Sequence, residues 1–276
     1  MTFKGSIKDL ETKARWVRRR VLDTTAATGK GHLGGTYSCT DLLVAFYYGG
    51  ILRIDSNNLD SPDRDRLLIG KGHACLALYS IFVDLGIMSQ ERFDTYSTDG
   101  GLGGQLDTSI PGVEYNTGSL GHVLGIASGM ALAAKQDSKD YRAYALMGDA
   151  ECYEGAIWEA LIYAGEQNLN RLVGIIDRNR LSVLDVLDDD GFFNDFPAKV
   201  KSFGWDCYEI DGHSFAQILD VFDKVKSADK PVMIVANTIK GKGVSFMENQ
   251  VRWHAGPPTA EELELARREL DKVDVD

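Results

Sequence analysis

The residues best suited to chemistry are an aspartate and an asparagine that each follow an apolar run. Asp149 comes directly after residues 143–148, and Asn179 comes soon after residues 172–176. Such runs are typical of buried parallel strands, and open parallel sheets bind their ligands beyond the carboxyl ends of the strands. A carboxylate and an amide oxygen are hard ligands that Mg²⁺ takes alongside phosphate oxygens. The pattern predicts a magnesium-bound phosphate group, although both residue types are also common in turns.

A predicted helix start could complete an anion site, and two histidines lie in glycine-containing loops. A helix predicted over residues 153–166 follows Asp149, and the start of a helix offers unpaired N–H groups to an anion. His32 lies in a glycine-rich turn at residues 31–35, and His73 ends the loop at residues 70–73. This second loop connects a short apolar run to a helix, an arrangement typical of the end of a parallel strand.

Apolar runs and helical periodicity alternate along most of the chain. Strands are predicted at residues 67–69, 143–147, 172–176, 205–210 and 232–236, and helices at residues 6–28, 74–85, 122–135, 153–166, 215–226 and 261–272. A further helix through residues 42–47 would follow the turn at residues 31–35, with Ser38 or Thr40 as its cap. Residues 56–66 and 97–119 are expected to be loops. This alternation indicates the α/β class, with a parallel sheet covered by helices on both faces.

Length and charge limit the function classes. A chain of 276 residues fits one large α/β domain or two small ones, and we expect a single domain over residues 1–276 with a charged surface helix near its end. The net charge of −11 argues against general nucleic-acid binding. No apolar run approaches the roughly 18 residues that span a bilayer, and the N-terminal residues do not resemble a secretory signal. We therefore expect a cytoplasmic protein with no nucleic-acid or membrane partner.

Cysteine spacing, basic residues and the lack of a glycine motif add three smaller expectations. The four cysteines are widely spaced, without a CxxC pair, which favours reduced and mostly buried thiols over a disulfide frame or a zinc site. A basic cluster on the first helix is expected to be solvated or to face a partner. It consists of Arg15, Arg18, Arg19 and Arg20. No GxGxxG motif follows a predicted strand, which disfavours a dinucleotide site.

Five segments, in this order along the chain, resemble the N-terminal half of transketolase, a thiamine-diphosphate enzyme. They are GHLGGTYSCTDLLVAFYY, DRDRLLIGKGHACLALYS, NTGSLGHVLGIASGMALAAK, GDAECYEGAIWEALIYAGEQNLNRLVGIIDRNRLSVLD and IKGKGVSFMENQVRWHAG. The family has a Gly-Asp-Gly motif followed by an asparagine-ended turn, which Gly148-Asp149-Ala150 and Asn179 match. The resemblance covers nearly the whole chain and implies the thiamine-diphosphate-binding fold. The length resembles that of the small subunit of a split transketolase.

This resemblance implies a metal and diphosphate site. Asp149, Asn179 and the backbone carbonyl of Leu181 would bind Mg²⁺, or Ca²⁺ or Mn²⁺ in its place. Gly148 and Ala150 would border the diphosphate of thiamine diphosphate in the same motif.

Histidines are implied in the cofactor site and the substrate site. His73 would reach the diphosphate as a neutral N–H donor, and the alternative is a helix-capping or core histidine. His32 resembles the family histidine close to the reactive thiazolium carbon and the substrate. His254 resembles a late histidine near the diphosphate or the substrate phosphate. His213, in an Asp-Gly-His turn, is expected to have a local structural role.

Two further segments carry implied roles. Gly118, Leu120 and His122 belong to a loop that lies against the cofactor in the family, where Leu120 would keep the cofactor bent. Glu154 would join a carboxylate network across the subunit contact, in which a shared proton is reasonable because adjacent negative charges raise a pKa. Glu159 matches a second acidic position, and the alternative is an exposed helix charge.

The sequence departs from the family pattern at four positions. Ala150 replaces the last glycine of Gly-Asp-Gly, which narrows the space beside the diphosphate but leaves the N–H donor. Leu33 replaces a proline after the first Gly-His, and Val123 replaces a common glycine. Gln105 replaces a histidine that contacts the cofactor or the substrate, and an amide cannot exchange a proton near neutral pH. These changes predict cofactor binding with an unusual substrate.

The expected function is that of an enzyme subunit. The resemblance implies thiamine-diphosphate-dependent transfer of a two-carbon ketol unit between sugar phosphates or related carbonyl compounds. It also implies a separate partner subunit that carries the pyrimidine-binding domain, with two of each chain in the assembly, because no second βαβ domain is visible here. Two alternatives are a carboligase that uses an α-keto acid or another non-sugar donor, and a non-catalytic scaffold subunit that binds the cofactor.

Overall fold

Five strands form a parallel sheet at the centre of the protein. The computed structural model describes residues 5–187, 191 and 193–272. Within them the strand order is β1-β2-β3-β5-β4, and every neighbouring pair is parallel. The strands are β1 (Arg66–Ile69), β2 (Ala143–Gly148), β3 (Leu172–Arg178), β4 (Asp206–Asp211) and β5 (Val232–Asn237). The predicted strands and the parallel sheet are confirmed.

Helices surround this sheet. Those of the described residues are α1 (Ile7–Thr28), α2 (Leu33–Tyr48), α3 (Cys75–Asp84), α4 (Gln90–Phe93), α5 (Val123–Gln136), α6 (Gly155–Glu166), α7 (Phe196–Ser202), α8 (Phe215–Val225) and α9 (Ala260–Leu270). Short 3₁₀ turns lie at Gly72–Ala74, Ala150–Tyr153 and Val251–His254. The sequence does not predict α4 and α7, because both are shorter than the 11–18 residues over which helical periodicity can be read. None of these helices is long and apolar enough to cross a membrane.

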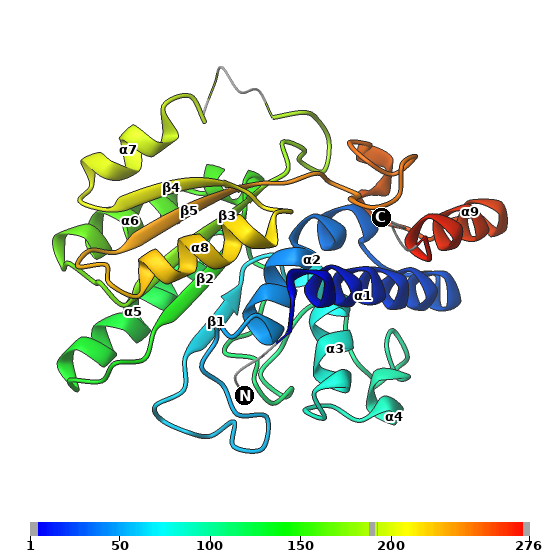
Figure 1. Ribbon diagram of the computed structural model, residues 1–276, viewed down its shortest axis with the longest axis horizontal. Coiled ribbons are helices and arrows are strands. Elements are labelled where there is room, and N and C mark those ends of the chain that lie inside the picture. The colour runs from blue at the N-terminus through cyan, green and yellow to red at the C-terminus, as the bar shows by residue number, and fades with distance from the viewer. Residues whose placement is uncertain (1–4, 188–190, 192, 273–276) are drawn as a thin grey trace.

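The two faces of the sheet pack into two hydrophobic clusters. Successive side chains of a strand point to opposite faces, so Tyr144 and Leu146 join one cluster while Ala145 and Met147 join the other. The first cluster contains side chains of α1, α2, α3 and α8, and the second contains side chains of α5, α6 and α7. Figure 1 shows α8 across one face of the sheet and α9 beside α1. Helices therefore cover both faces, as predicted.

The start of α2 differs from the prediction. Two of the three glycines of the predicted turn, Gly34 and Gly35, lie inside the helix, which begins at Leu33. Ser38 is an interior residue whose hydroxyl donates to the Gly35 carbonyl at 3.0 Å. A Cβ on Gly34 would lie 2.9 Å from the Trp253 carbonyl oxygen, and a Cβ on Gly35 would lie 3.0 Å from Nε2 of His73. These glycines permit close packing rather than a turn. Neither Ser38 nor Thr40 is a cap.

Gly165 provides a stability test of the packing between α6 and the segment before β4. A Cβ at this position would overlap the backbone carbonyl oxygen of Phe203. We expect Gly165→Ala to lower the free energy of unfolding by roughly 1–3 kcal/mol, because the backbone must shift to accommodate the methyl group. Urea denaturation measures this effect. Gly129→Ala in α5, where a Cβ would meet nothing within 4 Å, is the matched control and should instead stabilise the protein slightly.

Candidate functional site

The register of the sheet brings the predicted metal-ligating residues together. Gly148 of β2 lies opposite Asp177 of β3, so Asp149 meets the turn that follows β3. The carboxylate of Asp149 accepts hydrogen bonds from the backbone N–H of Arg180 at 2.6 Å and from that of Ala150 at 2.8 Å. The first bond ties the end of β2 to the turn that carries Asn179 and Leu181.

One cavity collects residues from these strand ends and from more distant loops. It is lined by Gly35, Lys71, His73, Leu120, Gly148, Asp149, Ala150, Glu151, Asn179, Leu181, Ser182, Val183, Lys240 and His254. Eight residues that the sequence analysis singles out are in this lining, all three predicted metal ligands among them. The cavity lies at the carboxyl end of the sheet, where parallel α/β folds bind their ligands.

Three histidines from distant parts of the chain meet beside this cavity, and two of them, His73 and His254, line it. The ring centroids of His32 and His73 are 5.2 Å apart, and that of His254 lies 5.4 Å and 5.6 Å from them, respectively. Burial, together with nearby lysine charges, lowers the pKa of each ring, to about 4 for His254. The rings are therefore neutral at pH 7, and each has one N–H donor and one acceptor nitrogen.

The sequence analysis did not identify Lys240, whose ammonium lies among these groups. Its Nζ donates to the carbonyl oxygens of Leu181 at 3.2 Å and Ser182 at 2.8 Å, and lies 3.4 Å from Nδ1 of His254. The side chain is 2% exposed, and burial lowers the pKa of the ammonium to about 8. Lysines are rarely buried, so the sequence offered no reason to place Lys240 inside the protein. Only the similarity of the segment around Lys240 to the family drew attention to it.

A buried ion pair next to the cavity was also missed. The ammonium of Lys71 pairs with the carboxylate of Asp177 and donates to the Gly35 carbonyl at 2.7 Å and to the Ser38 hydroxyl at 3.2 Å. The two charged side chains are 4% and 0% exposed. This pair links the ends of β1 and β3 to the start of α2. Its two members lie 106 positions apart in sequence, so no local pattern indicated it.

Glu151 is another buried ionisable side chain that the sequence did not indicate. Its carboxylate accepts hydrogen bonds from the backbone N–H groups of Gly121 at 3.0 Å and Gly148 at 3.2 Å. Burial raises the pKa of this carboxyl group to about 7. Glu151 therefore holds the loop of Leu120 against the end of β2.

His213 connects the same region to α1 and α2. Its Nε2 accepts a hydrogen bond from the N–H of Ile239 at 2.8 Å, and its Nδ1 lies 2.6 Å from the carboxylate of Asp41. Asp41 in turn binds the guanidinium of Arg18. His213 thus has the structural role expected of it, next to Lys240. Arg18 was expected to be solvated or to face a partner, but it is buried in this network.

Comparison with known proteins identifies the family. The family model described as the transketolase thiamine diphosphate binding domain matches residues 11–273. The chain belongs to this transketolase family. It is 38% identical over 268 residues to one of the apulose-4-phosphate transketolase subunits of Phocaeicola vulgatus, with 96% of this chain and 95% of the relative covered. It is 36% identical over 274 residues to the 6-deoxy-6-sulfo-D-fructose transketolase subunit SqwG of a Clostridium species, with 96% and 97% covered.

Whole transketolases match over part of their length. The chain is 31% identical to human transketolase over 253 residues, which cover 91% of this chain and 40% of the human protein. Campylobacter jejuni transketolase superposes with a TM-score of 0.90 at 27% identity, over 96% of this chain and 43% of that one. The predicted fold class and family are confirmed. The protein is a transketolase-like transferase subunit.

The cavity residues fit the metal and diphosphate that this family implies. Asp149 is 2% exposed, and within the described part of the chain its carboxylate has no cationic partner. Burial raises the pKa of this carboxyl group to about 6, so a divalent cation would stabilise its charged form. The carbonyl of Leu181 already accepts a cation, the Lys240 ammonium. Carboxylate, amide and carbonyl oxygens are hard ligands, which suit Mg²⁺ better than zinc.

The backbone after Asp149 differs from the expected helix start. Ala150–Tyr153 form a 3₁₀ turn, and α6 begins only at Gly155. The N–H of Ala150, expected to be available to an anion, donates to the Asp149 side chain instead.

Several residues with implied roles lie outside the cavity lining. Glu154 is exposed where α6 begins, and Glu159 is exposed one turn later. His122 is exposed at the start of α5. Gly118 has only the side chain of Gln105 within 4 Å of where a Cβ would be. The cavity lining does not include these residues, and their implied roles remain predictions.

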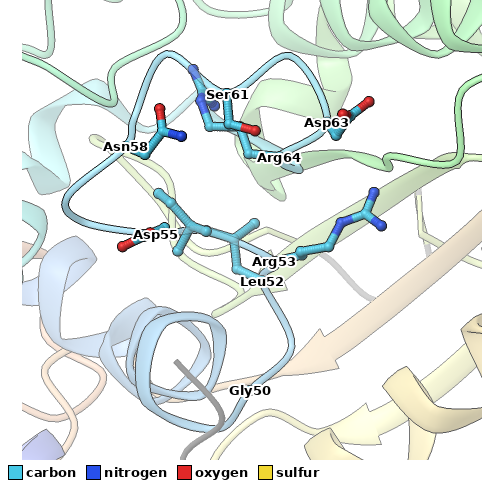
Figure 2. A pocket seen from close by; sticks show the side chains of 9 residues that line it. Gly50, Leu52, Arg53, Asp55, Asn58, Ser61, Asp63 and Arg64 are labelled. Atoms are coloured by element: carbon cyan, nitrogen blue, oxygen red, sulfur yellow. The ribbon is translucent and has the colours of Figure 1, made fainter.

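A different cavity lies at the opposite end of the sheet. Figure 2 shows it within the loop that connects α2 to β1, lined by residues such as Asp55, Asn58 and Ser61. Because β1 begins at Arg66, this loop precedes the amino end of the strand. Its two arginines form ion pairs, Arg53 with Asp140 and Arg64 with Glu114. The position and the engaged cations disfavour this cavity as the cofactor site.

Proposed function

We propose that this chain is the diphosphate-binding small subunit of a two-component, thiamine-diphosphate-dependent transketolase. The complete enzyme transfers a two-carbon ketol unit between sugar phosphates or related carbonyl compounds. The observation that carries this proposal is the cavity at the ends of β2 and β3. There a buried carboxylate, a carbonyl bound to a buried ammonium and neutral histidines surround one space. The whole of residues 1–276 acts as one thiamine-diphosphate-binding unit.

In this proposal the chain binds the diphosphate end of the cofactor. Asp149, Asn179 and the Leu181 carbonyl hold Mg²⁺, and Ca²⁺ or Mn²⁺ could replace it. Gly148 and Ala150 border the diphosphate. The cofactor, once bound, supplies the carbanion-stabilising chemistry, while the protein supplies orientation and electrostatics.

The side chains around the diphosphate provide donors, charge and the route to the substrate. His73 and His254 donate hydrogen bonds as neutral imidazoles, and Lys240 offers the positive charge that a diphosphate requires. His32, which contacts both histidines, is the residue closest to the substrate. Leu120 lies in the cavity wall against the cofactor, and Gly118 belongs to the same loop.

A partner chain completes the site in this proposal. The relatives that match along their whole length are named as subunits. The segment after the predicted metal ligands exposes apolar side chains, with Val183 55%, Leu184 88% and Val186 65% exposed. Exposed apolar clusters mark protein contacts, and Val183 also lines the cavity. The partner carries the pyrimidine-binding domain, assembles as two of each chain and meets Glu154 at the contact.

The substrate is a phosphorylated sugar or a close analogue of one. Two relatives are named for apulose 4-phosphate and 6-deoxy-6-sulfo-D-fructose, which are sugars with an anionic substituent. Gln105, in place of the family histidine, accepts a hydrogen bond from Thr117 at 3.4 Å and is exposed. An amide at this position favours a specialised substrate over the usual pentose phosphates. Full activity of the assembled enzyme with standard pentose phosphates would contradict this specialisation.

Partner dependence is the direct test of the two-component assignment. We expect the purified chain to bind thiamine diphosphate in calorimetry when Mg²⁺ is present but to show no ketol transfer. Activity should appear when the partner chain is added, because the residues around the pyrimidine ring come from that chain. Turnover by the isolated chain would refute the assignment. Binding without turnover, even with the partner present, would instead indicate the scaffold alternative.

A further inference from the structure

The side chain of Glu151 contacts three backbone segments beside the cavity at the ends of β2 and β3. One carboxylate oxygen accepts the N–H of Gly121 at 3.0 Å, and the other accepts the N–H of Gly148 at 3.2 Å. A Cβ on Gly70, directly after β1, would lie 2.2 Å and 2.3 Å from these two oxygens. This glycine therefore leaves the space that the carboxylate fills. Glu151 is 2% exposed and lines the cavity.

The loop that this carboxylate contacts carries Leu120. Among the described residues, no other hydrogen bond joins residues 118–121 to a distant part of the chain. Leu120 lines the cavity and is 38% exposed, so burial in the hydrophobic core does not fix its side chain. The position of Leu120 on the cavity therefore depends on the hydrogen bond between Gly121 and Glu151.

Leu120 can interact favourably with only one part of the cofactor. A leucine side chain has no charge and no hydrogen-bond donor, so contact with a diphosphate gains it nothing. Contact with an aromatic ring is favourable, because both apolar surfaces leave water. Thiamine diphosphate has both parts, a diphosphate and aromatic rings. A displaced Leu120 should therefore weaken the binding of the rings and leave the binding of the diphosphate unchanged.

We propose that Glu151 is a positioning residue that fixes Leu120 against the rings of thiamine diphosphate. This inference rests on the proposed function and adds to it a residue that selects the whole cofactor over free diphosphate. Glu151 acts through the loop of Leu120 rather than by binding the cofactor itself. The carboxylate suits this role because its two oxygens accept two N–H groups at once, whereas an amide has one acceptor oxygen.

Calorimetry of the purified chain tests the proposal with two ligands, thiamine diphosphate and inorganic diphosphate, each at saturating Mg²⁺. Glu151→Met keeps the length of the side chain but offers no strong acceptor to either N–H group. It should weaken thiamine diphosphate binding about tenfold, near the lower end of what burial of a leucine side chain contributes. Binding of inorganic diphosphate should change by less than about twofold. Glu151→Gln, with one acceptor oxygen, should recover part of the loss.

The matched control is Glu166→Met, which removes an exposed carboxylate at the end of α6. This variant should bind both ligands like the wild type. Urea denaturation shows whether each variant is folded, and Glu151→Gln carries the same comparison if Glu151→Met does not fold. Equal losses for the two ligands, or no loss for thiamine diphosphate, would overturn the proposal.

A double-mutant cycle tests whether Glu151 acts through Leu120. Leu120→Ala should also weaken the binding of thiamine diphosphate and spare that of inorganic diphosphate. Adding Glu151→Met to Leu120→Ala should then change the Kd by less than about twofold, because the side chain that Glu151 positions is already gone. Losses that multiply in the double variant would contradict the proposal, since the two residues would then act separately.

Amide hydrogen exchange tests the loop contact without any ligand. Exchange in a peptide that spans residues 116–124 should be at least about fivefold faster in Glu151→Met than in Glu166→Met, because the Gly121 N–H loses its partner. If the wild-type chain does not bind thiamine diphosphate, the proposed function fails, while faster exchange would still support the loop contact. Equal exchange in the two variants would overturn the inference, whatever the cofactor binding.

Discussion

Replacing Asp149 by alanine should abolish Mg²⁺-dependent binding of thiamine diphosphate to this chain. The carboxylate is buried at the end of β2, and within the described residues it lacks a cationic partner. It is also the only charged group among the three predicted metal ligands. Loss of an outer-shell partner of a metal ligand already weakens metal binding by about 10–100-fold, so loss of the ligand itself should cost more than about 100-fold. Isothermal titration calorimetry at fixed Mg²⁺ measures the change.

Two controls separate metal binding from folding. Asp149→Asn keeps the shape and one oxygen but removes the charge, so it should also bind the cofactor poorly while it unfolds close to the wild-type urea concentration. Asp220→Ala removes an exposed carboxylate that pairs only with Lys224 on the surface of α8, and it should bind like the wild type. Normal cofactor affinity in folded Asp149→Ala would reject the proposed metal site.

The sequence predicted the sheet and much of the site for a simple physical reason. A strand that is buried on both faces must be apolar throughout, so β2, β3 and β5 are visible as runs in the sequence. Residues that follow such strands must lie at one edge of the sheet. This reasoning alone predicts that Asp149 lies beside the turn of Asn179, and the register of β2 and β3 confirms that the two segments meet.

Buried charges could not be predicted in the same way. Lys71, Glu151 and Lys240 look like ordinary surface residues in the sequence, because what permits their burial is a partner elsewhere in the chain. Lys71 needs Asp177, and Lys240 needs the carbonyls of residues 181 and 182. The glycines at the start of α2 led to a different error. They predicted a turn, whereas Gly34 and Gly35 lie in the helix and permit close packing. Only tertiary contacts distinguish these cases.

Arg18→Met should cause the largest loss of stability. The guanidinium donates to both carboxylate oxygens of Asp41, at 3.0 Å and 2.6 Å, and to the Tyr37 carbonyl at 2.9 Å. Both charged side chains are 6% exposed. Removing one member of a buried pair leaves an uncompensated charge, which typically lowers the free energy of unfolding by about 3–5 kcal/mol. Urea denaturation at pH 7 measures the loss.

The neighbouring Arg19 provides the matched control on the same helix. It pairs with Asp23 and Asp271, but these side chains are 38% and 60% exposed. Arg19→Met should therefore lower the free energy of unfolding by less than about 1 kcal/mol. Similar losses in the two variants would show that the buried network adds nothing beyond an ordinary surface contact.

The pH dependence of the Arg18→Met effect gives a sharper test. Burial would raise the pKa of Asp41, but Arg18 and the hydrogen bond to His213 outweigh burial and hold the pKa below its usual value. Asp41 therefore stabilises the wild-type protein above the unfolded-state pKa of about 3.9, and this contribution is lost as pH falls through the lower folded-state pKa. Without Arg18, burial dominates and the pKa of Asp41 rises. The charged carboxylate then destabilises the variant as pH increases above about 4.

The difference in unfolding free energy between wild type and Arg18→Met should therefore be largest near pH 7 and shrink toward about pH 4. His213 cannot replace the lost cation without a further cost, because its Nε2 accepts the Ile239 N–H and protonation there would break that bond. Ile239 precedes Lys240, whose side chain lines the cavity at the ends of β2 and β3. A difference that does not change with pH would mean that the loss comes from packing of the arginine side chain and not from the charge left on Asp41.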